Sequence, residues 1–145
     1  MSEAEEDFTQ ADLHALRSCL RDMDSLLTRY PAEANDIAVR YSLIKTFELT
    51  FEMAVKTLTK YLLHNAVGGT EVQSYPFRDV IRLGDQERLL RSGWPEWKQY
   101  RQNRGRTVHA YREDVALAIT SQLSEFSEEA HVLLDNLARR LDDHG

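Results

Sequence analysis

The side chains best suited to chemistry in this sequence lie in residues 101–111, which read RQNRGRTVHAY. Arg104 is followed five positions later by His109, and Tyr111 stands two positions beyond His109. Histidine moves protons near neutral pH because its unperturbed pKa is about 6.5, and the planar guanidinium of arginine binds phosphate oxygens bidentately. RNA supplies its own nucleophile, the 2′-hydroxyl, so this set could cleave RNA without a metal ion.

The motif lies in the most basic part of an acidic chain. The formal net charge is −6, yet residues 78–112 hold nine basic side chains and four acidic ones, with Lys98, Arg101 and Arg106 close to the motif. A polyanion could bind at this segment while the acidic flanks face elsewhere. The alternative is that basic and acidic helices form salt bridges with each other inside a bundle, which is the commoner use of such charges.

The spacing of the motif does not place its residues on one helical face. Five residues at roughly 100° each leave Arg104 and His109 about 140° apart on an ideal helix. Either the backbone breaks near Gly105, or the two side chains converge with those of a second subunit. A histidine near a helix end can also be a solvated cap or an ion-pair partner, without any role in catalysis.

Long helices are expected to position these residues, because the three prolines and six glycines fall between apolar segments of helical period. The expected elements are a helix from Phe8 to Tyr30, a second from an N-cap near Asn35 to just before Gly68, a loop over residues 68–76, short helices over 76–83 and 85–91, a fourth element beginning at Pro95, and a helix from about Glu113 to nearly the end. The fold class is therefore all-α, an up-and-down bundle of four to five helices, with residues 1–145 as one domain and an ordered core over about 10–140.

The second helix has an unusually broad apolar stripe. The stripe contains Ile37, Tyr41, Ile44, Phe51, Val55, Leu58 and Leu62, and it is widened by Phe47, Ala54 and Tyr61. Such width indicates contact with more than one neighbour, either other helices or a second subunit. Glu48 and Glu52 lie one turn apart on this helix and could form a carboxylate pair, but Lys45 and Lys56 at helical spacing favour a surface ion-pair ladder.

Several classes of protein are excluded by motif and composition. The single cysteine, Cys19, allows no intramolecular disulfide and no thiolate cluster, and none of the five histidines belongs to a recognised ligand motif. We therefore expect neither a metal nor a cofactor. The acidic N-terminus does not resemble a signal peptide, and no apolar run is long enough for a membrane span, so the sequence predicts a cytoplasmic protein.

Three segments resemble one known family. They are YSLIKTFELTFEMAVKTLTKYL (41–62), FRDVIRLG (77–84) and WKQYRQNRGRTVHAYRED (97–114). The sequence is similar, over about residues 10 to 140, to the HEPN proteins encoded beside a minimal nucleotidyltransferase, which are also called nucleotidyltransferase substrate-binding proteins. Arg-x4-His is a weak signal alone, but Arg-x4-His-x-Tyr after a helix that begins with tryptophan is fairly specific.

This resemblance implies a helical dimer whose two Arg/His sets meet in a shared cleft. Many members are ribonuclease toxins, which implies metal-independent cleavage of tRNA or mRNA by Arg104 and His109. Lys98, Arg101 and Arg106 would then bind the RNA phosphates.

The resemblance also implies control by a partner. The partner would be the cognate minimal nucleotidyltransferase, an antitoxin that transfers AMP to the motif tyrosine, here Tyr111. The alternative function is a non-catalytic substrate-binding protein that docks the nucleotidyltransferase.

One position departs from the family pattern. The family usually has a polar residue, often asparagine, directly after the arginine, whereas this chain has Gly105. Asn103 and Arg106 lie close in sequence and could substitute for the missing side chain. Both a weakened nuclease and a member that only binds its partner are compatible with this departure.

Overall fold

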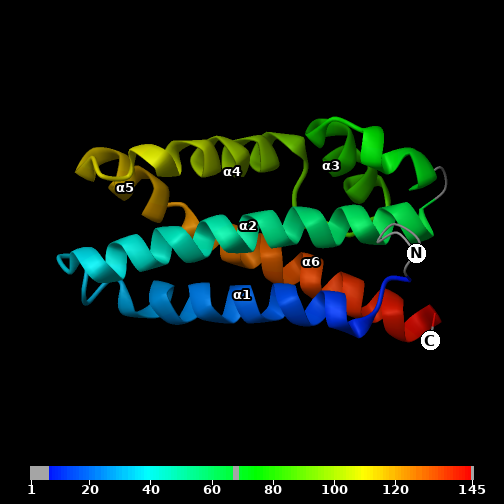
Figure 1. Cartoon of the computed structure of the whole chain (residues 1–145), viewed down its shortest axis with the longest axis horizontal. Coiled ribbons are helices and arrows are strands. Elements are labelled where there is room, and N and C mark those ends of the chain that lie inside the picture. The colour runs from blue at the N-terminus through cyan, green and yellow to red at the C-terminus, as the bar shows by residue number, and fades with distance from the viewer. Residues whose placement is uncertain (1–6, 67–68, 145) are drawn as a thin grey trace.

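The computed structural model describes residues 7–66 and 69–144, and all regular structure in this part of the chain is helical. The elements are α1 (Gln10–Arg29), α2 (Ile37–Asn65), the 3₁₀-helix η2 (Gly69–Ser74), α3 (Phe77–Gln86), α4 (Trp94–Arg106), the 3₁₀-helix η3 (Thr107–His109), α5 (Glu113–Thr120) and α6 (Leu123–His144). The chain reverses direction between α1, α2, α4 and α6, and α3 and α4 follow one another along α2 (Figure 1). The predicted all-α up-and-down bundle is confirmed.

Helix α1 begins where the sequence supplies a cap. Thr9 and Asp12 form a capping box, in which the Thr9 backbone N–H donates to the Asp12 carboxylate at 2.8 Å. The leucines of this helix recur in the sequence at three- and four-residue steps, which places them on one helical face, and Leu13, Leu16 and Leu20 are buried. Lys60 of α2 donates to Asp12 at 3.0 Å, so a polar contact joins the two helices where their apolar faces meet.

Helix α2 has Asp36 as its N-cap, one residue after the expected cap Asn35, and the Asp36 carboxylate accepts the Ala38 N–H at 2.9 Å. Most of its predicted stripe is buried within the chain, but Ile37 and Tyr41 are 57% and 43% exposed. Val39 and Leu43 take the inward positions of the first two turns. The start of α2 therefore presents apolar side chains to solvent.

An aromatic cluster joins α2, α4 and α6 at the centre of the bundle. The ring of Phe126 packs edge-on against Phe47 at 5.1 Å and against Tyr100 at 5.3 Å between centroids. Tyr100 in turn meets Trp97 at 5.4 Å, and the Trp97 side chain is fully buried. These contacts fix the position and the rotation of α4, and α4 carries the motif.

The predicted short helix over 85–91 is wrong. Helix α3 continues through Gly84 to Gln86, and the chain then turns with Arg88 in the left-handed region at a φ of 61°. The backbone N–H groups of Arg91 and Ser92 donate to the carboxylate of Glu129 on α6, at 2.7 and 3.3 Å. The Glu129 side chain, distant in sequence, therefore accepts the hydrogen bonds that backbone carbonyls would accept in a helix.

Two other expectations also need correction. Gly68 lies outside the described residues, but the rest of the expected loop contains η2. The single helix expected from Glu113 is divided into α5 and α6 at residues 121 and 122. At this break the Gln122 side chain accepts a hydrogen bond from Asn103 of α4 at 2.6 Å, a contact between helices that periodicity does not reveal.

Candidate functional site

Helix α4 divides the candidate residues between an inner and an outer face. Trp97, Tyr100 and Asn103 are buried, whereas Lys98 and Arg106 are exposed. The Asn103 amide donates to Gln122 at 2.6 Å and accepts from Gln99 at 3.3 Å, with only 1% of the residue exposed. Asn103 therefore cannot replace the polar side chain that Gly105 lacks, and that expectation was wrong.

Arg104 lies on the side of α4 that faces α2. Its Nε donates to Oε1 of Glu52 at 3.0 Å, and its Nη2 donates to the same oxygen. Its Nη1 donates to the Thr107 hydroxyl at 3.3 Å. The Lys45–Glu48 ion pair of the expected ladder is present at 3.4 Å, but the sequence did not reveal that Glu52 also meets Arg104. No spacing could have revealed it, because 52 residues separate the two.

The helix ends just after the motif arginine. Helix α4 remains regular through Gly105 and Arg106, so the backbone does not break at the glycine. Thr107 is buried, its hydroxyl donates to the Arg104 carbonyl at 2.8 Å, and η3 begins there. A Cβ added at Gly105 would meet no atom within 4 Å, so this position opens to solvent.

His109 and Tyr111 are brought together on the surface. Thr107 and Ala110 point into the core at the three-residue spacing of a 3₁₀ turn, which leaves His109 and Tyr111 outside. The two rings lie 6.3 Å apart between centroids at 66°, and Tyr111 is 71% exposed. The guanidinium of Arg104 hydrogen-bonds Glu52 and Thr107 rather than His109.

The predicted phosphate-binding cations differ in their surroundings. The guanidinium carbon of Arg101 lies 5.0 Å from the centroid of the Phe77 ring, a cation–π contact between α4 and α3. Lys98 and Arg106 are exposed on the outside of α4. Elsewhere in the basic segment, Arg91 pairs with Glu128 of α6 at 2.8 Å. One cation of the basic segment, Arg91, therefore pairs with the acidic helix α6, as the alternative proposed, whereas Lys98 and Arg106 are exposed to solvent.

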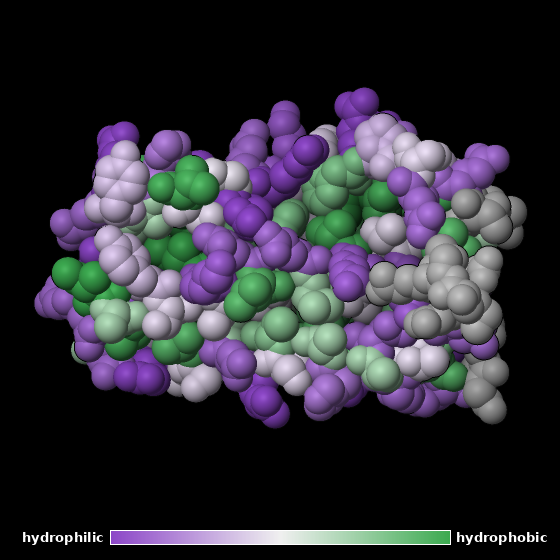
Figure 2. Space-filling view, in the orientation of Figure 1, coloured by the Kyte–Doolittle hydropathy of each residue, from purple (hydrophilic) through white to green (hydrophobic). Residues whose placement is uncertain are grey.

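Apolar side chains surround this end of the molecule. Figure 1 places the start of α2 and helix α5 at the same end of the bundle, and Figure 2 shows apolar surface there among polar residues. Ile37, Val108 and Leu117 are 57%, 69% and 46% exposed. Exposed apolar side chains next to a charged motif are suited to contact with another protein chain.

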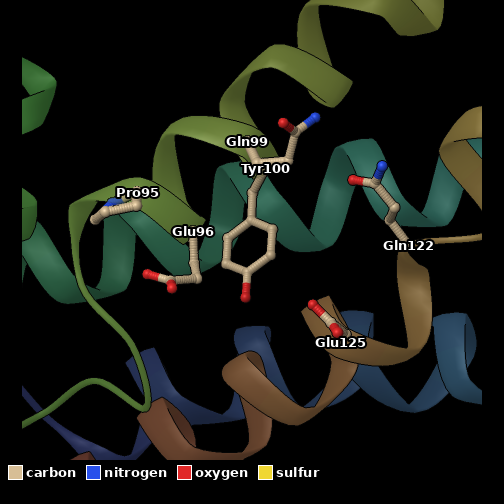
Figure 3. A pocket seen from close by; sticks show the side chains of 6 residues that line it. All are labelled: Pro95, Glu96, Gln99, Tyr100, Gln122 and Glu125. Carbon is tan, nitrogen blue, oxygen red and sulfur yellow. The ribbon is translucent and has the colours of Figure 1, made fainter.

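A separate cavity lies between α4 and the start of α6 (Figure 3). It measures about 210 Å³ and is lined by Pro95, Glu96, Gln99, Tyr100, Gln122 and Glu125. None of the predicted site residues lines it, and its two carboxylates would repel a phosphate. The cavity therefore does not extend the motif.

The described residues contain neither a metal site nor a membrane-spanning helix. No group of three histidine, cysteine or acidic side chains in residues 7–66 and 69–144 could hold a metal ion. No helix in the same part of the chain is long and apolar enough to cross a membrane.

Comparison with known proteins identifies a family and a solved structure that this chain resembles. Residues 11–139 match the family model described as nucleotidyltransferase substrate binding protein like. The chain is 29% identical over 97 residues to a Haemophilus influenzae protein named Probable ribonuclease HepT, an alignment covering 67% of this chain and 66% of that relative. The chain thus spans about two thirds of that relative's length.

A solved structure has the same fold. It is a Haemophilus influenzae protein whose structure was reported as the fold of a substrate-binding domain of a nucleotidyltransferase. The TM-score is 0.81 at 22% identity, and the match covers 87% of this chain and 98% of the other. The likeness extends over most of both chains and confirms the helical bundle.

Proposed function

This chain belongs to the family of nucleotidyltransferase substrate-binding-like proteins, and we propose that it is a HEPN-type endoribonuclease toxin paired with a minimal nucleotidyltransferase antitoxin. The observation that carries the proposal is the Arg104, His109 and Tyr111 motif at the solvent-exposed end of α4, with His109 and Tyr111 accessible. The resemblance of the chain to a protein named as a ribonuclease supports the same activity.

In the proposed reaction His109 takes a proton from the 2′-hydroxyl or gives one to the leaving oxygen. The 2′-oxygen attacks the adjacent phosphorus, the bond from phosphorus to the 5′-oxygen breaks, and the products carry a 2′,3′-cyclic phosphate and a 5′-hydroxyl. Arg104 stabilises the charge that develops on the phosphate oxygens. Exposed Lys98 and Arg106, with Arg101, attract the neighbouring phosphates.

The reaction uses one proton acceptor and one proton donor, and each chain offers one motif histidine. A homodimer would bring two copies of His109 and Arg104 to one cleft. Exposed apolar Ile37, Val108 and Leu117 support a contact with a second copy near the motif. The dimer would also explain how Arg104 and His109 act at one site, although they lie about 140° apart on an ideal helix.

Control by the antitoxin would act on Tyr111. Its side chain is 71% exposed, so its phenol oxygen is open to attack the α-phosphorus of ATP bound by the partner enzyme, with pyrophosphate as the leaving group. The attached AMP would place a phosphate beside His109, whose ring lies 6.3 Å from that of Tyr111. RNA would then be repelled by like charge and excluded by bulk.

A non-catalytic partner of the nucleotidyltransferase is the second candidate function. It is favoured by Gly105, which supplies no polar side chain after the arginine, and by the contact of Arg104 with Glu52. The family description, which names substrate binding, fits this role as well.

Cleavage of labelled tRNA and mRNA in the presence of a chelator separates the two functions. We expect the wild-type protein to cut RNA, and His109→Ala and Arg104→Ala to lose about 100-fold or more in rate. His14→Ala is the matched control, because it removes an exposed histidine of α1 and should cut like wild type. Intact RNA with the wild-type protein would contradict the ribonuclease, and stable binding of the transferase would then favour the second candidate.

Mass spectrometry tests the modification. Incubation with the transferase and ATP should add AMP to Tyr111 and stop cleavage, and Tyr111→Phe should accept none. Tyr41→Phe removes another exposed tyrosine and should be modified normally. AMP mapped to a different residue would refute the role of Tyr111.

A further inference from the structure

We infer that Glu52 is a displaceable counter-ion that occupies the phosphate-binding edge of Arg104 and competes with RNA for it. The inference rests on the proposed function, because it specifies how the same arginine is regulated. It assigns a role to a side chain of α2 that lies outside the motif.

The geometry of the guanidinium supports this role. An arginine binds a phosphate through two adjacent N–H groups, and the Nε and Nη2 pair forms one such edge. In the free chain both nitrogens of that edge donate to Oε1 of Glu52. The remaining terminal nitrogen, Nη1, donates to Thr107. A carboxylate oxygen therefore stands where a phosphate oxygen would bind.

The pair is accessible enough to be exchanged. The side chains of Arg104 and Glu52 are 30% and 55% exposed, so water screens their attraction. Ion pairs of this kind add at most a small stabilisation. An RNA phosphate that is also attracted by Lys98 and Arg106 can therefore replace the carboxylate, while Thr107 keeps the guanidinium at the end of α4.

The fold does not depend on this pair for the position of α4. Trp97 and Tyr100 anchor the helix through the aromatic cluster, and Asn103 ties it to Gln122. Removal of the Glu52 charge should leave these contacts intact. A change in RNA binding can then be assigned to Arg104 itself.

The test measures the Kd of an RNA oligonucleotide with 2′-O-methyl groups, which the protein cannot cleave. Glu52→Gln keeps an oxygen acceptor but removes the charge, and we expect RNA to bind roughly two- to fivefold more tightly. In an Arg104→Ala background, which binds RNA more weakly, the same substitution should have no more effect than the loss of another nearby negative charge. Thermal melting of each variant confirms that it is folded.

Glu48→Gln is the matched control for charge. Glu48 lies one turn away on the same helix, pairs with Lys45 at 3.4 Å, and loses the same charge on substitution. It should change the Kd by less than Glu52→Gln, and equally with or without Arg104. Equal tightening by both substitutions would show a general charge effect and overturn the inference.

Failure of the inference can be told apart from failure of the proposed function. If Arg104→Ala weakens binding but Glu52→Gln leaves the Kd unchanged or raises it, only the counter-ion role is refuted. If Arg104→Ala neither weakens RNA binding nor slows cleavage of unmodified RNA, the proposed function is refuted and the inference with it.

Discussion

One carboxylate contacts the turn before α4 and the middle of that helix, another contacts its C-terminal end, and the surroundings of the two are opposite. Glu129 is fully buried and accepts hydrogen bonds from the Arg91 and Ser92 backbone, the Ser92 hydroxyl and the Tyr100 phenol. Burial raises the pKa of Tyr100 to about 12, so this phenol remains a donor. Glu52, at the other end, has a side chain that is 55% exposed and meets Arg104.

The two carboxylates show that one part of α4 is held for the fold and another part is free to take part in function. A buried carboxylate that accepts four hydrogen bonds holds the turn before α4 and the helix in place, because buried polar groups need hydrogen-bond partners. A half-exposed carboxylate paired with an arginine contributes little stability and can be exchanged for another anion. The N-terminal end of α4 is therefore the anchor, and its C-terminal end is the part available to a ligand.

The largest expected effect is on the anchor. Glu129→Ala removes a buried acceptor that serves two backbone N–H groups, a hydroxyl and a phenol, and we expect a loss of about 3 kcal/mol or more in the free energy of unfolding. Urea denaturation measures it. Glu128→Ala is the control, because its side chain is 64% exposed and its ion pair with Arg91 should contribute less than about 1 kcal/mol. Equal losses would refute the contrast.

The next largest effect is a loss of cleavage activity with little change in stability. His109→Ala and Arg104→Ala should each slow RNA cleavage about 100-fold or more, yet change the free energy of unfolding by less than about 1 kcal/mol, because both side chains lie at the surface end of α4. Paired rate and denaturation measurements test this. A large loss of stability in either variant would mean that the motif belongs to the anchor.

Substitutions of Gly105 test the exposed C-terminal end of α4. Because its Cβ position is open, Gly105→Ala should stabilise α4 by up to about 1 kcal/mol, and Gly105→Asn by less. Only asparagine adds a polar side chain beside Arg104, so cleavage should be roughly two- to tenfold faster with asparagine than with alanine. Equal rates for the two variants would show that the missing polar residue has no role.

The smallest effect concerns the cap of α1, which lies away from both ends of α4. Burial tends to raise the pKa of Asp12, but hydrogen bonds from the Thr9 backbone and from Lys60 outweigh it and lower the pKa below 3.8. A lowered folded-state pKa stabilises the protein above the unfolded value, and this contribution is lost as the pH falls through the folded value.

Asp12→Asn should therefore cost up to about 1 kcal/mol at neutral pH. The difference from wild type should shrink as the pH falls below 3.8. Melting temperatures across acidic pH measure it. A difference that persists unchanged at the lowest pH would show that the carboxylate charge is not the cause.

Prediction from sequence succeeded where contacts are local. The stripe of Leu13, Leu16 and Leu20, and the end of α2 before Gly68, follow from helical period and glycine placement. It failed at the turn before α4, where Glu129 replaces helical carbonyls as the partner of the Arg91 and Ser92 N–H groups. It also failed for Asn103, since a polar residue on a helix gives no sign of being buried against another amide.

The sequence by itself determined the helices, the motif and its basic surroundings, because helical period, capping and residue chemistry depend on neighbours along the chain. Only the tertiary structure decided that Arg104 meets Glu52, that Asn103 turns inward and that His109 and Tyr111 share one exposed surface. These outcomes depend on how α4 is rotated against α2 and α6. Packing of the aromatic cluster sets that rotation, and periodicity shows which face is apolar but not which neighbour it will meet.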